Sequence, residues 1–232
     1  MNEGSAVASG ERPVRVWDLP TRAFHWLLVF FVIFSVVTAY IGGNAMVWHM
    51  RSGFAILALL AFRLVWGFVG GHWSRFRAFV YAPSTSLRYL RGQTQPHEHH
   101  HVGHNPLGAG SVFALLAVLA LQVATGLVAD DEIATTGPLI KYVSSATSSL
   151  ATGWHKNYGQ WIIFALVAMH VGAIAFYWFR RRQNLVGPMW HGDKLLTADV
   201  PHAVDNGRTR TIALMVAVVC ALVVTAVVRL GG

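Results

Sequence analysis

The sequence predicts an all-α integral membrane protein, built as a four-helix transmembrane bundle with a fifth transmembrane helix at the carboxyl end. Hydrophobic residues make up 54% of the 232 residues and charged residues only 12%, too few to cover a water-soluble globule. Five apolar runs are long enough to cross, as helices, a hydrocarbon layer about 30 Å thick. Basic residues flank these runs instead of forming one stripe. The formal charge of +8 therefore indicates contact with membrane lipid, not with nucleic acid.

The chain divides into an amino-terminal arm, five spans and polar connections. Residues 1–13 are expected to form a disordered arm, because residues 1–10 are small and polar. They are not expected to be a signal peptide, because no short apolar core with a cleavage site follows them. Glycine pairs, prolines and charged residues interrupt the apolar runs and set the expected helix ends. Residues 191–232 are expected to be a polar linker followed by the additional span. The expected spans are about 23–41, 47–69, 107–129, 154–179 and 211–228.

Two connections contain patterns of their own. The connection before the third span contains a histidine tract, which we interpret either as a solvated loop or as an ancillary metal site. In the connection 130–153, Pro138 precedes apolar residues spaced by four, three and four positions, which predicts a short amphipathic helix on the membrane surface. The two sets of residues are His97, His99, His100, His101 and His104, and Leu139, Val143, Ala146 and Leu150.

The basic residues also predict the orientation of the spans. Of the 18 lysines and arginines, 14 lie in the amino-terminal arm, the second connection and the fourth connection, or at helix ends that enter them. Cytoplasmic loops of membrane proteins carry an excess of these residues. We therefore expect a cytoplasmic amino terminus and a periplasmic carboxyl terminus. The acidic run Asp130-Asp131-Glu132 falls on the periplasmic side.

Histidines near the edges of the spans are the strongest functional signal. An ionisable side chain inside a membrane helix indicates function, because hydrocarbon penalises it. In the fourth span, His155 and His170 are fifteen positions apart, which places them roughly 22 Å apart along an α-helix and about 60° apart around its axis. With the orientation above, His170 lies at the inner level with His25, and His155 at the outer level with His49. The sequence thus predicts two histidine pairs matched by depth.

Two neutral imidazoles facing each other suit the axial positions of a planar macrocycle with low-spin iron, and apolar helix faces would bury that macrocycle. Zinc or copper would need further cysteine or carboxylate ligands, which these spans lack. The single cysteine, Cys220, and the lack of a C-x-x-C-H motif exclude covalent haem attachment. Any haem in these pairs would therefore be held by side-chain ligation alone.

Neighbouring residues have expected supporting roles. Gly53 and Gly159 each follow a ligand histidine by four positions, on the same helix face, and would leave room for a porphyrin edge or for ordinary close helix packing. His72, near the inner edge, is a weaker rival to His25. The expected partners of the haem propionates are Arg22 at the inner site and Arg51 and Lys156 at the outer site.

Several motifs resemble those of bacterial cytochrome b561-type proteins, the group that includes the b-type cytochrome subunits of nickel–iron hydrogenases. They are V-R-V-W-D-L-P-T-R-A-F-H-W at 14–26, W-H at 48–49, F-R-L-V-W-G-F-V-G at 62–70, G-H-N-P-L-G at 103–108 and T-G-L at 125–127. The resemblance implies a four-helix dihaem domain at 14–190, with two non-covalent b-type haems, in the bacterial cytoplasmic (inner) membrane. It also implies that His25, His49, His155 and His170 are the haem ligands. The fifth span lies outside this pattern, and we expect it to dock a partner.

The expected function is electron transfer across the membrane between the quinone pool and a periplasmic redox partner, a c-type cytochrome or a hydrogenase. The acidic start of the 130–153 connection would attract a basic patch on that partner, and the chain could also pair as a homodimer. One alternative is a superoxide:quinone oxidoreductase, in which Arg51, Lys141 and Lys156 draw the anion to the outer haem. Another is a proton or metal transporter with a histidine relay, which the lack of acidic residues in the spans disfavours.

Overall fold

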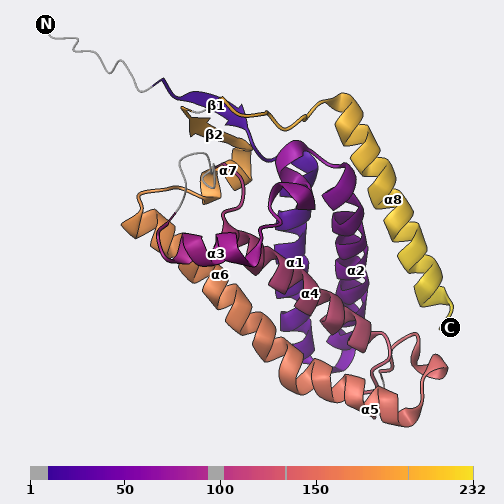
Figure 1. Ribbon diagram of the computed structural model, residues 1–232. Helices are drawn as coiled ribbons and strands as arrows, with labels where there is room; N and C mark the ends of the chain where they lie inside the picture. Colours follow the sequence, from indigo (N-terminus) through magenta and orange to yellow (C-terminus); the bar gives the residue numbers. More distant parts are fainter. Residues whose placement is uncertain (1–9, 94–101, 134, 198, 232) are drawn as a thin grey trace, which may run out of the picture.

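The computed structural model describes residues 10–93, 102–133, 135–197 and 199–231, and this part of the chain is almost entirely helical (Figure 1). The α-helices are α1 Leu19–Ile41, α2 Met46–Val69, α3 Pro83–Leu90, α4 Pro106–Gly126, α5 Ser145–Gly153, α6 Gln160–Arg180, α7 Val186–His191 and α8 Gly207–Arg229. Short 3-10 segments are η1 Gly43–Ala45, η2 His72–Ser74, η3 Phe76–Ala78 and η4 Ile140–Tyr142, and η5 Trp154–Gly159 is a π-helix. Strands β1 Arg12–Arg15 and β2 Asp193–Leu196 form a two-stranded sheet.

Five helical segments are long and apolar enough to cross a membrane, which confirms the predicted all-α membrane fold. Their positions agree with the predicted spans to within a few residues, except in the fourth span. There α5, η5 and α6 follow one another without a break, so the helical segment runs from Ser145 to Arg180. The first helix starts at Leu19, four residues earlier than expected, because the side chain of Asp18 caps it.

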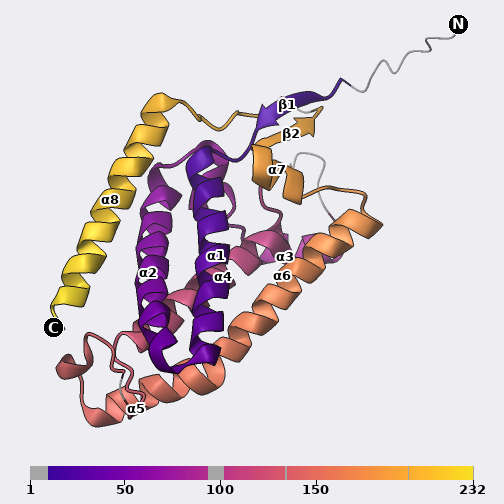
Figure 2. The same ribbon diagram turned by 180° about the vertical axis from the view of Figure 1, so that it is seen from behind.

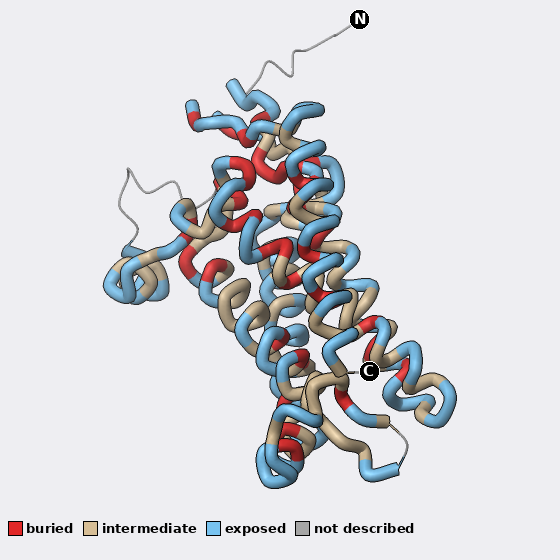
Figure 3. Tube along the Cα trace, turned by 90° about the vertical axis from the view of Figure 1, so that its right-hand side faces the viewer, coloured by how far each residue is buried: buried red, intermediate tan, exposed pale blue. Residues whose placement is uncertain are grey.

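The helices pack around the hairpin of α1 and α2, which the turn at Gly42 and η1 closes. Helix α2 also packs against α8 and α4, and α4 packs against α6. Figures 1 and 2 show α8 beside α2 on one side of the bundle and α6 running obliquely on the other. Many large apolar residues of the spans are exposed, and Figure 3 shows exposed, pale-blue residues all along the helices. This is expected for helices that face lipid.

The small sheet joins the amino-terminal segment to the polar linker after α7, and the sequence predicted no secondary structure for either of them. β1 and β2 pair antiparallel, with Arg12 opposite Leu196 and Arg15 opposite Asp193. Val14 is fully buried in a cluster with Leu196. The predicted disorder of residues 1–13 is therefore wrong for Arg12 and Pro13, while residues 1–9 lie outside the described part. Pairing between strands about 180 residues apart leaves no local signal in either segment.

Asp205 ties the linker before α8 to the start of α1. Its carboxylate is nearly buried and accepts hydrogen bonds from Arg15 Nη1 at 3.0 Å, Arg210 Nε at 2.8 Å and the Leu19 N–H at 3.2 Å. Arg22 Nη2 lies 3.8 Å away. These charge-assisted contacts compensate for the burial of the carboxylate. The segment predicted as a plain polar linker thus folds onto the amino-terminal end of the bundle.

Asp18 links the beginning of α1 to the end of α2. This fully buried carboxylate accepts four hydrogen bonds: Oδ1 from the Thr21 N–H and Trp66 Nε1, and Oδ2 from the Gly71 N–H and Ser74 Oγ. The donor–acceptor distances are 2.8, 3.3, 2.9 and 2.9 Å. Every acceptor position of the carboxylate is therefore used inside the protein, which explains why a charge is tolerated there.

Asp18→Ala is expected to lower the free energy of unfolding by about 3 kcal/mol, because buried donors lose their acceptor. The apparent melting temperature in detergent, followed by circular dichroism, measures the loss. The matched control is Asp199→Ala, since Asp199 is almost fully exposed and pairs with Arg12 at the surface; its effect should stay within about 0.5 kcal/mol. Equal melting temperatures of the two variants would contradict the role of Asp18.

The predicted amphipathic helix after Pro138 is misplaced. A 3-10 turn covers Ile140–Tyr142, and α5 begins only at Ser145, where the Ser144 side chain caps the Thr147 N–H. The side of α5 that packs inward carries Ser148, whose Oγ donates to the Val128 carbonyl at 2.8 Å. Leu150, expected on the apolar face, is 78% exposed. Apolar spacing alone did not reveal the serine cap that sets the start of this helix.

Candidate functional site

His49 and His155 meet at the end of the bundle opposite the amino terminus. Their ring centroids are 5.9 Å apart and their planes are nearly perpendicular, at 85°. A metal–imidazole bond is about 2 Å long and the ligating nitrogen lies roughly 1 Å from the ring centre, so two imidazoles on one metal have centroids about 6 Å apart. The pair predicted from depth alone therefore has the separation of two axial ligands of one metal ion.

Main-chain carbonyls fix which nitrogen of each ring is free. Nδ1 of His49 lies 2.9 Å from the carbonyl oxygen of Ser35 on α1, and Nδ1 of His155 lies 2.8 Å from that of Gln122 on α4. A carbonyl only accepts, so each Nδ1 donates, and in the neutral ring this leaves the lone pair on Nε2, where a metal can bind. The sequence does not indicate these roles of Ser35 and Gln122, because every residue type has a backbone carbonyl.

A cavity of about 500 Å³ adjoins this histidine pair. Its walls are largely apolar and come from α1, α2, α4 and α6; Ile56, Leu119 and Ile163 belong both to the wall and to a buried core cluster. Nowhere in the described ranges do three histidine, cysteine or carboxylate side chains converge. Two nitrogen ligands beside an apolar cavity suit a flat apolar macrocycle that supplies the remaining ligands itself.

The two glycines predicted to clear space behave differently. Gly53 lines the cavity, and a Cβ built on it would meet no atom within 4 Å, so a side chain there would occupy open cavity space. At Gly159 a Cβ would collide with the Gln122 side chain of α4. The expected role of Gly159 in making room for a porphyrin edge is therefore wrong, because the glycine makes room for a neighbouring helix.

Gly126 is a glycine that sequence reasoning missed. A Cβ at this position would lie 2.9 Å from Cε1 and 3.2 Å from Nδ1 of His155. The absence of a side chain lets the imidazole lie directly against α4 and reach the Gln122 carbonyl. Gly126 occurs in the T-G-L motif at 125–127, but the motif alone does not reveal which side chain packs on the glycine.

The π-helix η5 changes the predicted relation between the two histidines of the fourth span. η5 covers Trp154–Gly159 and includes His155, whereas His170 lies in regular α-helix. A π turn holds an extra residue, so it rotates His155 around the axis relative to an uninterrupted α-helix. The separation of about 60° expected from 100° per residue is therefore wrong for this segment. Short π segments inside α-helices often lie at functional sites.

The three predicted propionate partners lie in different surroundings. Lys156 lines the cavity beside His155. Arg51 is exposed and stacks over the Trp48 ring, with its guanidinium carbon 5.0 Å from the ring centroid. Arg22 donates to the Trp190 carbonyl at 2.6 Å and lies near Asp205, while its buried Nε has no partner. Of the three, Lys156 is the one that borders the cavity.

His25 and His170 form the second predicted pair, toward the amino-terminal end. They lie within electrostatic range of each other, His25 on α1 and His170 on α6. Nδ1 of His25 is buried and has no hydrogen-bond partner. His72, the rival to His25, is exposed and packs edge-on against Trp73. The structure therefore brings His25, not His72, toward His170.

His104 is an unexpected third histidine of this region. Its ring packs between Trp17, at 4.7 Å between centroids, and Phe79, at 4.5 Å, and it lies within electrostatic range of His25 and His170. Burial, together with the positive charge of Arg63, lowers the pKa of His104 to about 3, so the ring is neutral. The solvated-loop interpretation is wrong for His104; residues 97–101 of the tract lie outside the described part.

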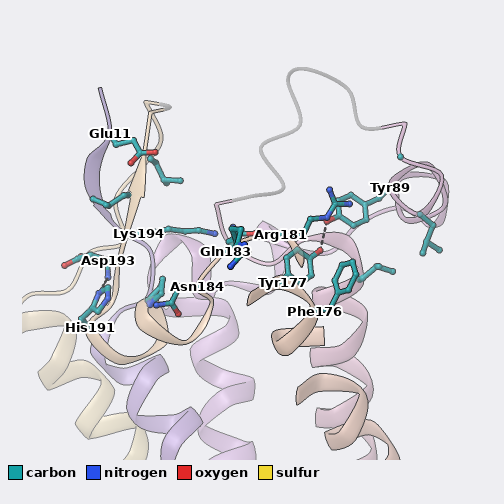
Figure 4. A pocket seen from close by; sticks show the side chains of 17 residues that line it. Glu11, Tyr89, Phe176, Tyr177, Arg181, Gln183, Asn184, His191, Asp193 and Lys194 are labelled. Atoms are coloured by element: carbon teal, nitrogen blue, oxygen red, sulfur yellow. Dashed lines mark hydrogen bonds between the residues drawn. The ribbon is translucent and has the colours of Figure 1, made fainter. Parts of the chain in front are cut away.

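An open cleft of about 1080 Å³ lies at the amino-terminal end, beside the end of α6 (Figure 4). Arg181 and Lys194 line it, and burial lowers the pKa of Lys194 to about 8. At its edge Tyr177 OH lies 2.9 Å from Tyr89 OH and accepts a hydrogen bond from Asn105 Nδ2 at 2.8 Å. Tyr177 is seven residues after His170, on the same face of α6. The Asn105 contact thus holds the segment containing His104 against α6.

Membrane-spanning helices that bring two histidine side chains together beside an apolar cavity are typical of an integral membrane cytochrome of the b type. The family model of prokaryotic cytochrome b561 matches residues 16–192, and the chain belongs to this family. The resemblance stated from the sequence motifs is thereby confirmed. As a b-type cytochrome, the chain is a membrane electron-transfer protein that binds haem b.

The curated relatives that match the chain are named as probable B-type cytochrome subunits of Ni/Fe-hydrogenases. The chain is 24% identical to the probable Ni/Fe-hydrogenase B-type cytochrome subunit of Bradyrhizobium diazoefficiens over 82% of its length and 91% of the relative. It is 26% identical to the probable Ni/Fe-hydrogenase 1 B-type cytochrome subunit of Escherichia coli K12, over 67% of the chain and 80% of the relative. The probable Ni/Fe-hydrogenase B-type cytochrome subunit of Azotobacter chroococcum is also 26% identical, over 86% of the chain and 95% of the relative. No solved structure matches the chain.

Proposed function

We propose that this cytochrome holds two b haems and carries electrons across the bacterial cytoplasmic membrane, between a periplasmic hydrogenase and the quinone pool. The 5.9 Å separation of the His49 and His155 rings is the observation that carries the proposal, because it fits two axial ligands of one iron. The hydrogenase as partner rests on the relatives, whose printed names make them probable hydrogenase cytochrome subunits.

The residues at each site have separate tasks. Haem iron supplies the one-electron chemistry when it is bound. Nε2 of His49 and His155 would hold one haem, and the carbonyls of Ser35 and Gln122 keep both rings in the ligating tautomer. The apolar wall excludes water and so limits the cost of reorganisation. His25 and His170 would hold the second haem.

The continuous helical segment of η5 and α6 spans the distance between the two proposed sites. His155 and His170 are fifteen residues apart, which corresponds to roughly 22 Å of α-helical rise. Most basic residues lie at the amino-terminal end, so this end is proposed to be cytoplasmic. The periplasmic partner would then dock at the opposite end, where Asp130 and Asp131 border the cavity beside His155.

The first test is the cofactor content of the protein purified from cells supplied with haem. We expect a b-type visible spectrum and about two haems per chain, because the chain offers two separate histidine pairs. Haem quantification by pyridine haemochrome, relative to protein mass, measures the ratio. A ratio of about one would remove the second site from the proposal, and a colourless protein would contradict it altogether.

The partner is tested by mild affinity purification from the native membrane. Recovery of a hydrogenase, and reduction of the haems by hydrogen in that preparation but not in the isolated chain, would support the proposal. Rapid reduction of the isolated chain by superoxide, without any protein partner, would contradict it and favour a superoxide:quinone oxidoreductase.

A further inference from the structure

Arg63 is a buried cation within the second span. The residue is 3% exposed and its Nη1 atom has no hydrogen-bond partner. Across the described residues, no carboxylate lies within ion-pair distance of its guanidinium. The contacts that the structure gives it are with aromatic faces, at 4.7 Å from the Phe76 centroid and 5.9 Å from that of Phe79. A cation in such a place is costly unless an anion accompanies it.

Asp18 does not supply the missing anion. It is close enough to interact with Arg63 electrostatically, but its two oxygens already accept four hydrogen bonds from other groups. The contacts with the aromatic rings do not compensate for the burial of the guanidinium either. A cation–π contact is worth about 2 kcal/mol when it is desolvated, whereas burial of an uncompensated ion costs several kcal/mol. Arg63 therefore lacks the acceptor that a buried guanidinium requires.

Arg63 lies at the level of the His25–His170 pair. His25 is six residues from the first residue of α1, and Arg63 is six residues from the last residue of α2, at the same end of the antiparallel hairpin. Their neighbours Phe24 and Phe62 are in ring contact at 6.4 Å. Arg63 thus lies at the same level of the bundle as His25, and it is buried there.

His104 brings a second polar group to the same place. Its ring packs on Phe79, which also contacts Arg63, and its Nδ1 is buried without a hydrogen-bond partner. It lies within electrostatic range of Arg63, His25 and His170. A neutral imidazole can donate one hydrogen bond, and a guanidinium can donate several in a fixed fork. Together they present buried donors, one of them charged, for a carboxylate.

We propose that Arg63, assisted by His104, binds a propionate carboxylate of the haem held by His25 and His170. This inference rests on the proposed function, since it requires that haem. The guanidinium fork matches a carboxylate in two parallel hydrogen bonds and neutralises its charge where water is excluded. Arg22, the partner expected from the sequence, already donates to Trp190 and lies beside Asp205.

The test is a redox titration of the purified holoprotein carrying Arg63→Gln. Loss of the cation leaves the propionate charge uncompensated, which favours the oxidised iron, so the midpoint potential of one haem should shift to a more negative value. That haem is the one that His170→Ala removes; the other should titrate as in the unmodified protein. Arg77→Gln is the matched control, because Arg77 is an exposed arginine on η3 and its loss changes the net charge equally.

A second readout reports the carboxylate itself. With haem labelled with ¹³C at the propionates, the redox-difference infrared spectrum should contain a labelled carboxylate band that moves in Arg63→Gln and stays in place in Arg77→Gln. If Arg63→Gln does not retain the haem, Arg63→Lys keeps the charge but not the fork; it should retain the haem and still move the band.

The outcomes separate this inference from the proposed function. Two haems, with unchanged potentials and an unchanged propionate band in Arg63→Gln, would overturn the role of Arg63 and leave electron transfer intact. A potential shift without any change of the propionate band would mean that Arg63 compensates a free anion or acts through space, and would also overturn it. A protein with no haem between His25 and His170 would remove the proposed function together with this inference.

Discussion

His170→Ala is expected to lower the haem content from about two per chain to about one, and His155→Ala is expected to remove the other haem. The reason is the separation of the two histidines along one helical segment, which places each with a different partner. His155 meets His49, and His170 lies within electrostatic range of His25. A five-coordinate haem that has lost one of two axial histidines would be bound far less tightly.

Haem quantification and low-temperature absorption spectra of the two variants measure this result. The remaining haem should keep its band and its midpoint potential in each case, so the two spectra should add up to that of the unmodified protein. His72→Ala is the matched control, since His72 is an exposed histidine at the start of η2, and this variant should keep both haems. Loss of the same haem in both variants would show that the histidines are paired differently.

Gly126→Val is expected to weaken binding of the haem at the His49–His155 site by about 10- to 100-fold, the range for loss of a group that orients a ligand. Even the first carbon of the new side chain would lie 2.9 Å from Cε1 of His155. The imidazole must then move away from α4, and its hydrogen bond to the Gln122 carbonyl breaks. The free energy of unfolding of the apoprotein should change much less.

Gly110→Val tests whether the effect belongs to the site. Gly110 lies on the same helix, and a Cβ there would meet no atom within 4 Å, so the substitution introduces the same β-branched residue without a collision. It should retain both haems. Equal haem content in Gly126→Val and Gly110→Val would mean that close packing of His155 on α4 is not required for binding.

The two predicted histidine pairs depended on the known thickness of the membrane. The fixed thickness of the apolar layer assigns a depth to each histidine, so His25, His49, His155 and His170 could be paired from the sequence without knowledge of the packing. The structure brings His49 and His155 into ring contact. Arg63 also gives a signal in the sequence, since it is an ionisable residue inside an apolar run, and it is one of the 14 basic residues that predict the orientation.

Other parts of the site could not be found in this way. His104 belongs to a tract that is polar in sequence, and its burial depends on Trp17 and Phe79, which are distant along the chain. Gly159 has the expected spacing from His155, yet it faces Gln122 of α4 because of where that helix lies. Local spacing defines a helix face, and only the neighbouring elements define what the face meets.

By itself, the sequence determined the five apolar helices and the family of the protein. These follow from local hydrophobicity and from motifs that are contiguous in the chain. The tertiary structure alone decided the β1–β2 pairing, the π turn at His155 and the carbonyls that orient both rings. It also decided that Arg63 forms no ion pair with a carboxylate of the described residues. Each of these results from contacts between segments that are far apart in the chain. The free energy of such contacts cannot be inferred from a local sequence pattern.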